Sequence, residues 1–431
     1  MSEELESRAA MRRIRLEELS EARERARDAE AEEGASRIIS DVAVRGEAAV
    51  REWAEKLDGL APDAPLIIER PALEAALASL GPDERGVLER AHERVASFAA
   101  AQRASLRDID VAVPGGRAGH VFIPVSRAGC YAPGGRFPLP SSAIMTATAA
   151  KAAGVTSVWC AGPKPAQATL AAAALSGADG FLAAGGAQGI AALALGAGVP
   201  ACDVVVGPGG RYVAAAKRLL FGVVGTEAPA GPSELLIIAG SGADPESAAA
   251  DLLAQAEHDV AAVPAIVALE GPLGVGPDFP DALEAALERR LAALPEPNRS
   301  TATAALKNGW ILLARDEAEA KAAAERFSPE HLELLVPEPR AWSASIKNAG
   351  AVFLGSGSAE VFGDYGAGPN HCLPTGGAAR FAAGLSVLAF LRARTWLEMD
   401  DSGALARESA ALARIEGLEA HARAAELRVG K

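Results

Sequence analysis

The sequence has few aromatic residues and few cysteines. Phe, Trp and Tyr make up only 4% of its 431 residues, and its four cysteines include no Cys-x-x-Cys pair. That spacing excludes a zinc knuckle of thiolates and a thioredoxin-type redox motif. The opening residues, MSEELESRAAMRRIRLEEL, lack the apolar segment of a secretory signal peptide. We therefore expect free thiols and a reducing, cytoplasmic location.

Basic residues are outnumbered by acidic ones, 42 to 56, and long apolar runs are also scarce. The formal net charge is −14, which argues against nucleic acid as the main partner. One uncharged stretch, residues 180–202, contains six glycines, a glutamine and a proline. A membrane helix requires about 20 continuous, predominantly large apolar residues. We therefore expect this stretch to form a buried strand, a turn and a buried helix, with no membrane partner.

The common nucleotide-binding motifs are missing as well. Neither G-x-G-x-x-G nor G-x-x-x-x-G-K-[ST] occurs in the sequence. Two other glycine-rich segments, GGAQG (185–189) and GPGG (207–210), follow predicted strands. Ligands of open α/β sheets bind at the carboxyl ends of strands, and glycines there let a phosphate approach the backbone. Glycine turns of this kind also occur without a ligand, so the segments alone are weak indicators.

Half of the residues are hydrophobic, and their pattern predicts an α/β fold. From residue 129, short apolar runs alternate with alanine-rich helical stretches, which is typical of a doubly wound parallel sheet. A second unit of the same kind begins at the apolar run 235–240. Charged helical patterns over 1–33 and over 384–428 flank these two units.

Two short motifs bring together residues that can bind metal or move protons. In Gln-Ala-Glu-His, Gln255 and His258 share one helical face and could chelate a metal, or could form an ordinary polar pair at a helix end. Glu330 and His331 follow Pro329 at the start of a predicted strand. Adjacent residues of a regular strand face opposite sides, so both can serve one site only at an irregular strand entry. A surface salt bridge is the alternative.

Polar residues also gather in the glycine-rich segment GDYGAGPNH (363–371) and in EGLEAH near the end of the chain. The first contains Asp364 and His371, and the second contains Glu416 and His421. With Gln255 and His258, the residues Asp364 and His421 form a nitrogen and oxygen ligand set without a thiolate. Such a set is typical of catalytic rather than structural zinc. Glu330 and His331 are the candidate proton-transfer groups.

These motifs, in this order over roughly residues 36–428, resemble the histidinol dehydrogenase family. The resemblance rests on GCYAPGGRFPLPSSAIMTATAAKAAGV (129–155), GGAQGIAAL (185–193), GPGGRYVAAAKR (207–218), AGPSE (230–234), DLLAQAEHD (251–259), SPEHLEL (328–334), NAGAVFLG (348–355), GDYGAGPNHCLPTGGAARF (363–381) and EGLEAHA (416–422).

The resemblance implies two nucleotide-fold-like α/β domains, one inserted in the other, with helical extensions at both ends. The expected divisions are an N-terminal helical arm (1–33), a discontinuous domain (34–129 plus 235–383), an inserted domain (130–234) and a C-terminal helical domain (384–431). It also implies an intertwined homodimer whose subunits share their active sites.

The implied activity is oxidation of L-histidinol to L-histidine through L-histidinaldehyde with two NAD⁺, in histidine biosynthesis. One zinc ion per subunit would be bound by Gln255, His258, Asp364 and His421. The acid–base pair would be Glu330 and His331. The substrate would also contact Ser233, His371 and Glu416, and NAD would contact Tyr131, Gln188 and Gly210.

Two positions depart from the family pattern. Gly210 stands where an asparagine is usual, and Ala254 stands where a serine usually precedes the Gln-x-x-His pair. The residues alone leave three other functions possible. They are an oxidoreductase for another polar alcohol, a zinc hydrolase in which Glu330 activates water, and a non-catalytic dimer stabilised by zinc.

Overall fold

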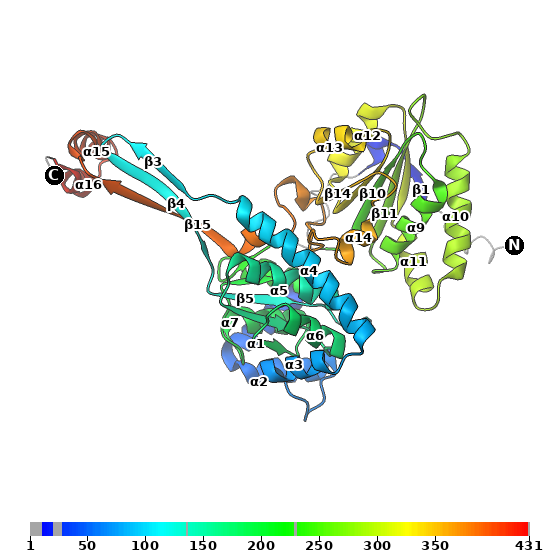
Figure 1. Ribbon diagram of the computed structural model, residues 1–431, viewed down its shortest axis with the longest axis horizontal. Coiled ribbons are helices and arrows are strands. Elements are labelled where there is room, and N and C mark those ends of the chain that lie inside the picture. The colour runs from blue at the N-terminus through cyan, green and yellow to red at the C-terminus, as the bar shows by residue number, and fades with distance from the viewer. Residues whose placement is uncertain (1–10, 20–27, 135–136, 228–230, 430–431) are drawn as a thin grey trace.

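The computed structural model describes residues 11–19, 28–134, 137–227 and 231–429, which form two parallel-sheet units and a projecting arm (Figure 1). The α/β fold with two doubly wound sheets is confirmed. Each sheet has six strands. The first sheet along the chain has the order β2-β7-β6-β5-β8-β9, and the second has the order β1-β12-β11-β10-β13-β14.

The first sheet is parallel except for its edge strand β2, which runs antiparallel to β7. Its strands are β2 (Ile67–Glu69), β5 (Arg127–Tyr131), β6 (Ser157–Ala161), β7 (Gly180–Leu182), β8 (Val204–Val206) and β9 (Gly225–Thr226). One face packs against α3 (Arg70–Ala78), α4 (Pro82–Ser105), α5 (Pro140–Ala153) and α6 (Gln167–Leu175). The other packs against α1 (Ala29–Arg45), α2 (Glu47–Trp53), α7 (Gly186–Leu195) and α8 (Arg211–Leu220). The many buried alanines let these helices lie close to the sheet.

The second sheet is parallel throughout. Its strands are β1 (Arg12–Ile14), β10 (Glu234–Ala239), β11 (Val263–Leu269), β12 (Trp310–Ala314), β13 (His331–Leu335) and β14 (Ala351–Leu354). One face packs against α9 (Pro245–Ala256), α10 (Phe279–Ala293) and α11 (Asn298–Leu306), and the other against α12 (Glu317–Phe327) and α13 (Pro339–Ser345). The central strand β10 is buried on both faces, which explains its continuous apolar sequence.

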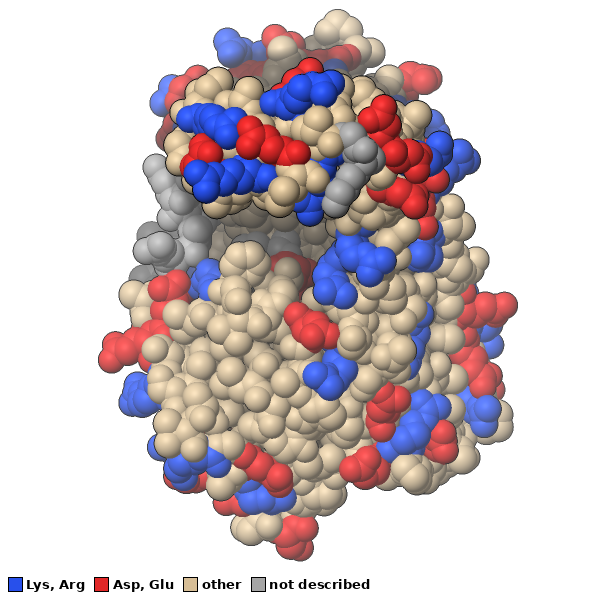
Figure 2. Space-filling view, turned by 90° about the vertical axis from the view of Figure 1, so that its left-hand side faces the viewer, with Lys and Arg blue, Asp and Glu red and all other residues tan. Residues whose placement is uncertain are grey.

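The arm is a long antiparallel ribbon that ends in two helices (Figure 1). It consists of β3 (Ile109–Val113), β4 (Gly116–Pro124), β15 (Leu391–Met399), α15 (Gly403–Ile415) and α16 (Glu419–Glu426). Figure 2 shows the helical end of the arm above a body surface that carries few charges, whereas its own surface mixes charges of both signs.

Three details differ from the sequence predictions. Residues 391–399 are not helical, because they pair with β4 over nine positions far away in the sequence. Residues 12–14 form a strand on β12 rather than part of a helix, and the rest of that predicted helix at 1–10 and 20–27 lies outside the described residues. The strand β2, which lies in the range predicted to belong with 235–383, pairs instead with β7 of the predicted inserted segment 130–234.

The uncharged stretch 180–202 forms the buried strand β7 and the buried helix α7, as predicted. Across the described ranges, no helix is both long and apolar enough to cross a membrane.

Candidate active site

The predicted acid–base residues lie where two neighbouring strands of the second sheet begin. Glu330 directly precedes β13, which begins at His331, and Ser233 directly precedes β10, whose Leu235 is paired with His331. Ser233 Oγ donates a hydrogen bond of 2.6 Å to Glu330 Oε2, and the Glu234 backbone N–H donates one of 2.9 Å to the same oxygen. Both side chains of the Glu-His dipeptide are buried, and His331 Nδ1 lies 3.7 Å from Glu330 Oε2.

Burial sets the proton affinities of this pair. Loss of hydration raises the pKa of Glu330 well above its ordinary value, although its bonds to Ser233 and Glu234 oppose that rise. The same loss of hydration lowers the pKa of His331 to about 4, so its imidazole is neutral at neutral pH. His331 Nδ1 lies 3.1 Å from the backbone oxygen of Glu234. Because a carbonyl can only accept, Nδ1 carries the proton and Nε2 is left as a base.

Three of the four predicted metal ligands belong to elements that meet beside this pair. Gln255 lies in the last turn of α9, His258 follows that helix, and Asp364 ends α14 (Glu360–Asp364), which packs on α9. His258 Nε2 is 3.6 Å from Asp364 Oδ2. The Gln255 side chain is fully buried, and its oxygen and nitrogen have no hydrogen-bond partner among the described residues.

His371 lies next to these ligands. Its Nδ1 is 3.0 Å from the backbone oxygen of Asp364, and its Nε2 is 3.5 Å from Ser142 Oγ on α5 of the first unit. Burial lowers the pKa of His371, so this imidazole is also held neutral. The loop around His371 therefore connects the two sheet units at the candidate site.

Sequence reasoning missed Glu360, the first residue of α14. It is buried, and its Oε1 lies 3.5 Å from His331 Nδ1. Ligand atoms of His331, Glu360 and Asp364 all lie within 4.8 Å of one another, close enough to hold a metal ion. Burial, together with the charges of Asp364 and Glu333, raises the pKa of Glu360 well above its ordinary value. The sequence does not indicate that Glu360 belongs to the site, because nothing in the residues around it predicts that its side chain is buried.

The donor atoms fit a divalent metal bound by nitrogen and oxygen. The orphaned amide of Gln255 supports this fit, because a buried polar side chain without a partner is unusual in a folded protein. Asp364 belongs both to the predicted ligand set and to the group with His331 and Glu360.

Two predicted residues are not brought to this place within one chain. Glu416 caps the end of α15 and His421 lies on α16, both at the far end of the arm (Figure 1). Both side chains are exposed.

The predicted NAD-contacting residues gather at the carboxyl edge of the first sheet. Tyr131 ends β5, Gln188 lies in the first turn of α7 after β7, and Gly210 precedes α8 after β8. Because β5 lies between β6 and β8, the strand order reverses here, which is where open α/β sheets bind ligands. The Tyr131 hydroxyl accepts a hydrogen bond of 3.0 Å from the Gly186 N–H.

Asp58, at the end of the π-helical turn Ala54–Asp58, was not predicted at this edge. Its Oδ2 accepts hydrogen bonds from the Gly185 N–H at 2.8 Å and from Gln188 Nε2 at 3.0 Å. Burial raises the pKa of Asp58, and these two hydrogen bonds oppose the rise.

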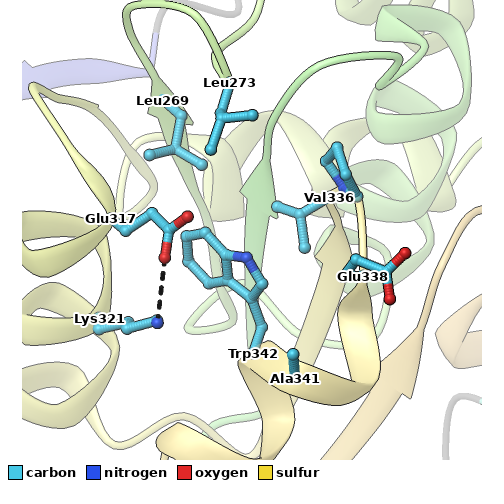
Figure 3. Close-up of a pocket in the computed structure, with 9 residues that line it drawn as sticks. Leu269, Leu273, Glu317, Lys321, Val336, Glu338, Ala341 and Trp342 are labelled. Atoms are coloured by element: carbon cyan, nitrogen blue, oxygen red, sulfur yellow. Dashed lines mark hydrogen bonds and ion pairs between the residues drawn. The ribbon is translucent and has the colours of Figure 1, made fainter.

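A hollow of about 240 Å³ lies elsewhere, at the carboxyl edge of the second sheet (Figure 3). Leu269 and Val336 line it together with Trp342, whose ring lies 4.7 Å from Lys321 Nζ. Lys321 is also paired with Glu317 at 3.2 Å. Ser233 and His331 are at the opposite, amino edge of the same sheet, so this hollow is separate from the candidate active site.

Comparison with known proteins shows the family of the chain. The family model described as histidinol dehydrogenase matches residues 21–429. The chain is 41% identical over 405 residues to a histidinol dehydrogenase of Dechloromonas aromatica, which covers 91% of each chain. It is 43% identical over 397 residues to that of Thermus thermophilus, covering 91% of this chain and 93% of the relative. A solved histidinol dehydrogenase from Elizabethkingia anophelis superposes with a TM-score of 0.85 at 28% identity, covering 94% of this chain and 92% of the other.

Proposed function

The chain belongs to the histidinol dehydrogenase family, which uses NAD, and we propose that it converts L-histidinol to L-histidine through L-histidinaldehyde at one site. The observation that carries this proposal is the buried Glu330–His331 pair, whose members can each accept a proton in a different step of the reaction. His331 is a neutral base, and Glu330 is a carboxyl group oriented by Ser233.

The first step removes a hydride and a proton from the alcohol. His331 Nε2 takes the hydroxyl proton while the carbon-bound hydrogen leaves with its electron pair to NAD⁺, which gives the aldehyde and NADH. The hydrogen bond from Nδ1 to the Glu234 carbonyl stabilises the positive charge that forms on the imidazole.

The second step requires water. The Glu330 carboxylate takes a proton from a water molecule as its oxygen adds to the aldehyde carbon, and then gives that proton to the former carbonyl oxygen, which yields a neutral diol. The diol loses its carbon-bound hydrogen as a second hydride to another NAD⁺ and a hydroxyl proton to Glu330, which gives the acid and NADH. Ser233 and the Glu234 N–H bind one oxygen of Glu330 and fix its direction. Burial makes the ionised carboxylate a stronger base than it would be in water.

We assign Gln255, His258 and Asp364 as ligands of one zinc ion per subunit, with His421 of a second copy as the fourth. The support is the 3.6 Å approach of His258 to Asp364 and the orphaned amide of Gln255. When bound, the metal would supply a Lewis-acidic anchor for the nitrogens of the substrate. Ser233, His371 and Glu416 of the second copy would complete the substrate contacts.

We also propose a homodimer with shared sites, which the position of the arm supports. His421 and Glu416 lie far from the other site residues of their own chain (Figure 1). The helix α15 exposes large apolar side chains, with Ile415 83% and Leu412 58% exposed. A second copy that covers these side chains would receive His421 at its own site. The four free, buried cysteines support a reducing cytoplasmic location.

The direct test is the yield of NADH from purified protein with histidinol and NAD⁺. We expect two NADH for each histidinol consumed, and zinc in a ratio of one per chain by metal analysis. Turnover only with other polar alcohols would assign another substrate. Hydrolysis of esters or amides without NAD reduction would instead indicate a zinc hydrolase.

A further inference from the structure

The side chain of Gln188 is hydrogen-bonded to Asp58 at one end and, within the described part of the chain, has no partner at the other. The Gln188 side chain is 1% exposed, and its Nε2 donates to Asp58 Oδ2. Because a carboxylate accepts hydrogen bonds, the amide atom that faces Asp58 is the nitrogen Nε2, and the oxygen Oε1 points away from it. The other end, Oε1, is buried and has no partner among the residues that the structure describes. A buried acceptor left open in this way indicates a missing donor.

Asp58 is itself held firmly by the backbone around it. It ends a π-helical turn, and Gly59 follows with a left-handed φ of +64°. Its carboxylate reaches the Gly185 N–H at 2.8 Å. A Cβ atom on Gly185 would lie 2.9 Å from Asp58 Oδ1 and 2.8 Å from Pro163 Cβ, so only glycine permits this approach. Asp58 thus forms hydrogen bonds to two residues of the GGAQG segment, Gly185 and Gln188, from a separate part of the chain.

The open Oε1 of Gln188 lies in the first turn of α7, where Gly186 binds the Tyr131 hydroxyl. Tyr131 ends β5 at the point where the strand order reverses. The open acceptor is therefore at the edge of the sheet that we assign to the dinucleotide. Nicotinamide and ribose carry N–H and O–H donors, whereas an ionised phosphate has none.

We propose that Asp58 is a positioning residue for the dinucleotide: it holds the Gln188 amide so that Oε1 faces the ligand and accepts a hydrogen bond from its carboxamide or a ribose hydroxyl. The inference rests on the proposed NAD site. The structure also predicts that a phosphate group is not the partner of Gln188, because an acceptor and a nearby carboxylate face it.

The test is a double-mutant cycle between Asp58 and Gln188. Loss of one oriented hydrogen bond corresponds to a factor of about five to ten in affinity. We expect Asp58→Ala to raise Kd and KM for NAD⁺ by that factor, with KM for histidinol unchanged. Asp58→Asn, which keeps a carbonyl acceptor for Gln188, should recover most of the affinity. In a Gln188→Met background, Asp58→Ala should add little.

The exposed Asp63 provides the control, because Asp63→Ala removes a carboxylate from the same stretch of sequence. The donor is identified with 3-acetylpyridine adenine dinucleotide, which lacks the carboxamide N–H. If that N–H is the donor, the effect of Asp58→Ala shrinks with this analogue, whereas an unchanged effect indicates a ribose hydroxyl.

Fully additive effects in the cycle, or an equal loss of affinity for histidinol, would overturn the proposal. So would NAD⁺ binding by Asp58→Ala as tight as that of the unaltered protein. If the unaltered protein itself binds no NAD⁺, the proposed function fails before this inference is tested.

Discussion

Ser233 and Glu330, which lie 97 positions apart, form a hydrogen bond of 2.6 Å across two neighbouring parallel strands. The bond determines the direction of the carboxylate that we assign to water activation. It also favours the ionised form of Glu330 against the effect of burial.

Removing this hydrogen bond should change the pH dependence of aldehyde oxidation. The bond stabilises the charged carboxylate, so Ser233→Ala raises the pKa of Glu330 further. Because Glu330 must be ionised to accept a proton from water, the acidic limb of the rate profile should move to higher pH. The measurement is the pH profile with added histidinaldehyde. An acidic limb at the same pH in both proteins would show that Ser233 does not affect the ionisation of Glu330.

Glu330→Gln should slow the two half-reactions unequally. The amide cannot take a proton from water, so we expect oxidation of added aldehyde to fall by roughly 10²–10⁴-fold. The first hydride transfer, measured in single-turnover experiments with histidinol, should fall much less. Equal losses in both half-reactions would contradict the assignment of Glu330 to hydration.

His331→Asn should have the opposite pattern. Asparagine keeps a polar side chain near the Glu234 carbonyl but has no base in place of Nε2. The alcohol half-reaction should therefore fall by roughly 10²–10⁴-fold, while NAD⁺ affinity is unchanged. Near-normal histidinol oxidation at neutral pH would remove His331 from the proposed mechanism.

Glu333, behind this site on β13, should affect stability rather than catalysis. Its Oε1 accepts a hydrogen bond from the Glu360 N–H, and burial beside Asp251 raises its pKa to about 8. The folded protein therefore holds a proton that the unfolded chain releases near pH 4.5, so stability falls as pH rises between these values.

Glu333→Gln removes that dependence, since glutamine stays neutral. We expect the melting temperature of the variant to exceed that of the unaltered protein by roughly 5 °C at pH 8 and to match it near pH 4.5. Thermal unfolding at both pH values, with zinc present throughout, is the measurement. A constant difference at the two pH values would show that Glu333 does not bind the extra proton.

Local patterns in the sequence predicted the parallel-sheet elements and the position of Glu330 and His331. Pro329 and the apolar run after it indicate a strand entry, and the structure has β13 begin at His331. Gln255 and His258 are likewise close in sequence. In contrast, Glu360 and Asp58 become important only through burial and through contacts with residues far away in the chain.

The arm shows the same limit of local patterns. The sequence of residues 391–399 is compatible with a helix, and only pairing with β4, which lies far earlier in the chain, makes it a strand. The strand Arg12–Ile14 is short and charged, so its pairing with β12 has no local signal either.

In the proposed dimer, His258 of one subunit and His421 of another serve the same site. This sharing is tested by mixing two inactive variants, His258→Asn and His421→Asn, each with its own affinity tag, and isolating the heterodimer. One of its two sites then has both histidines, so we predict about half of the activity of the unaltered dimer. Purified heterodimers that are as inactive as the two parent variants would show that each site takes both histidines from one chain.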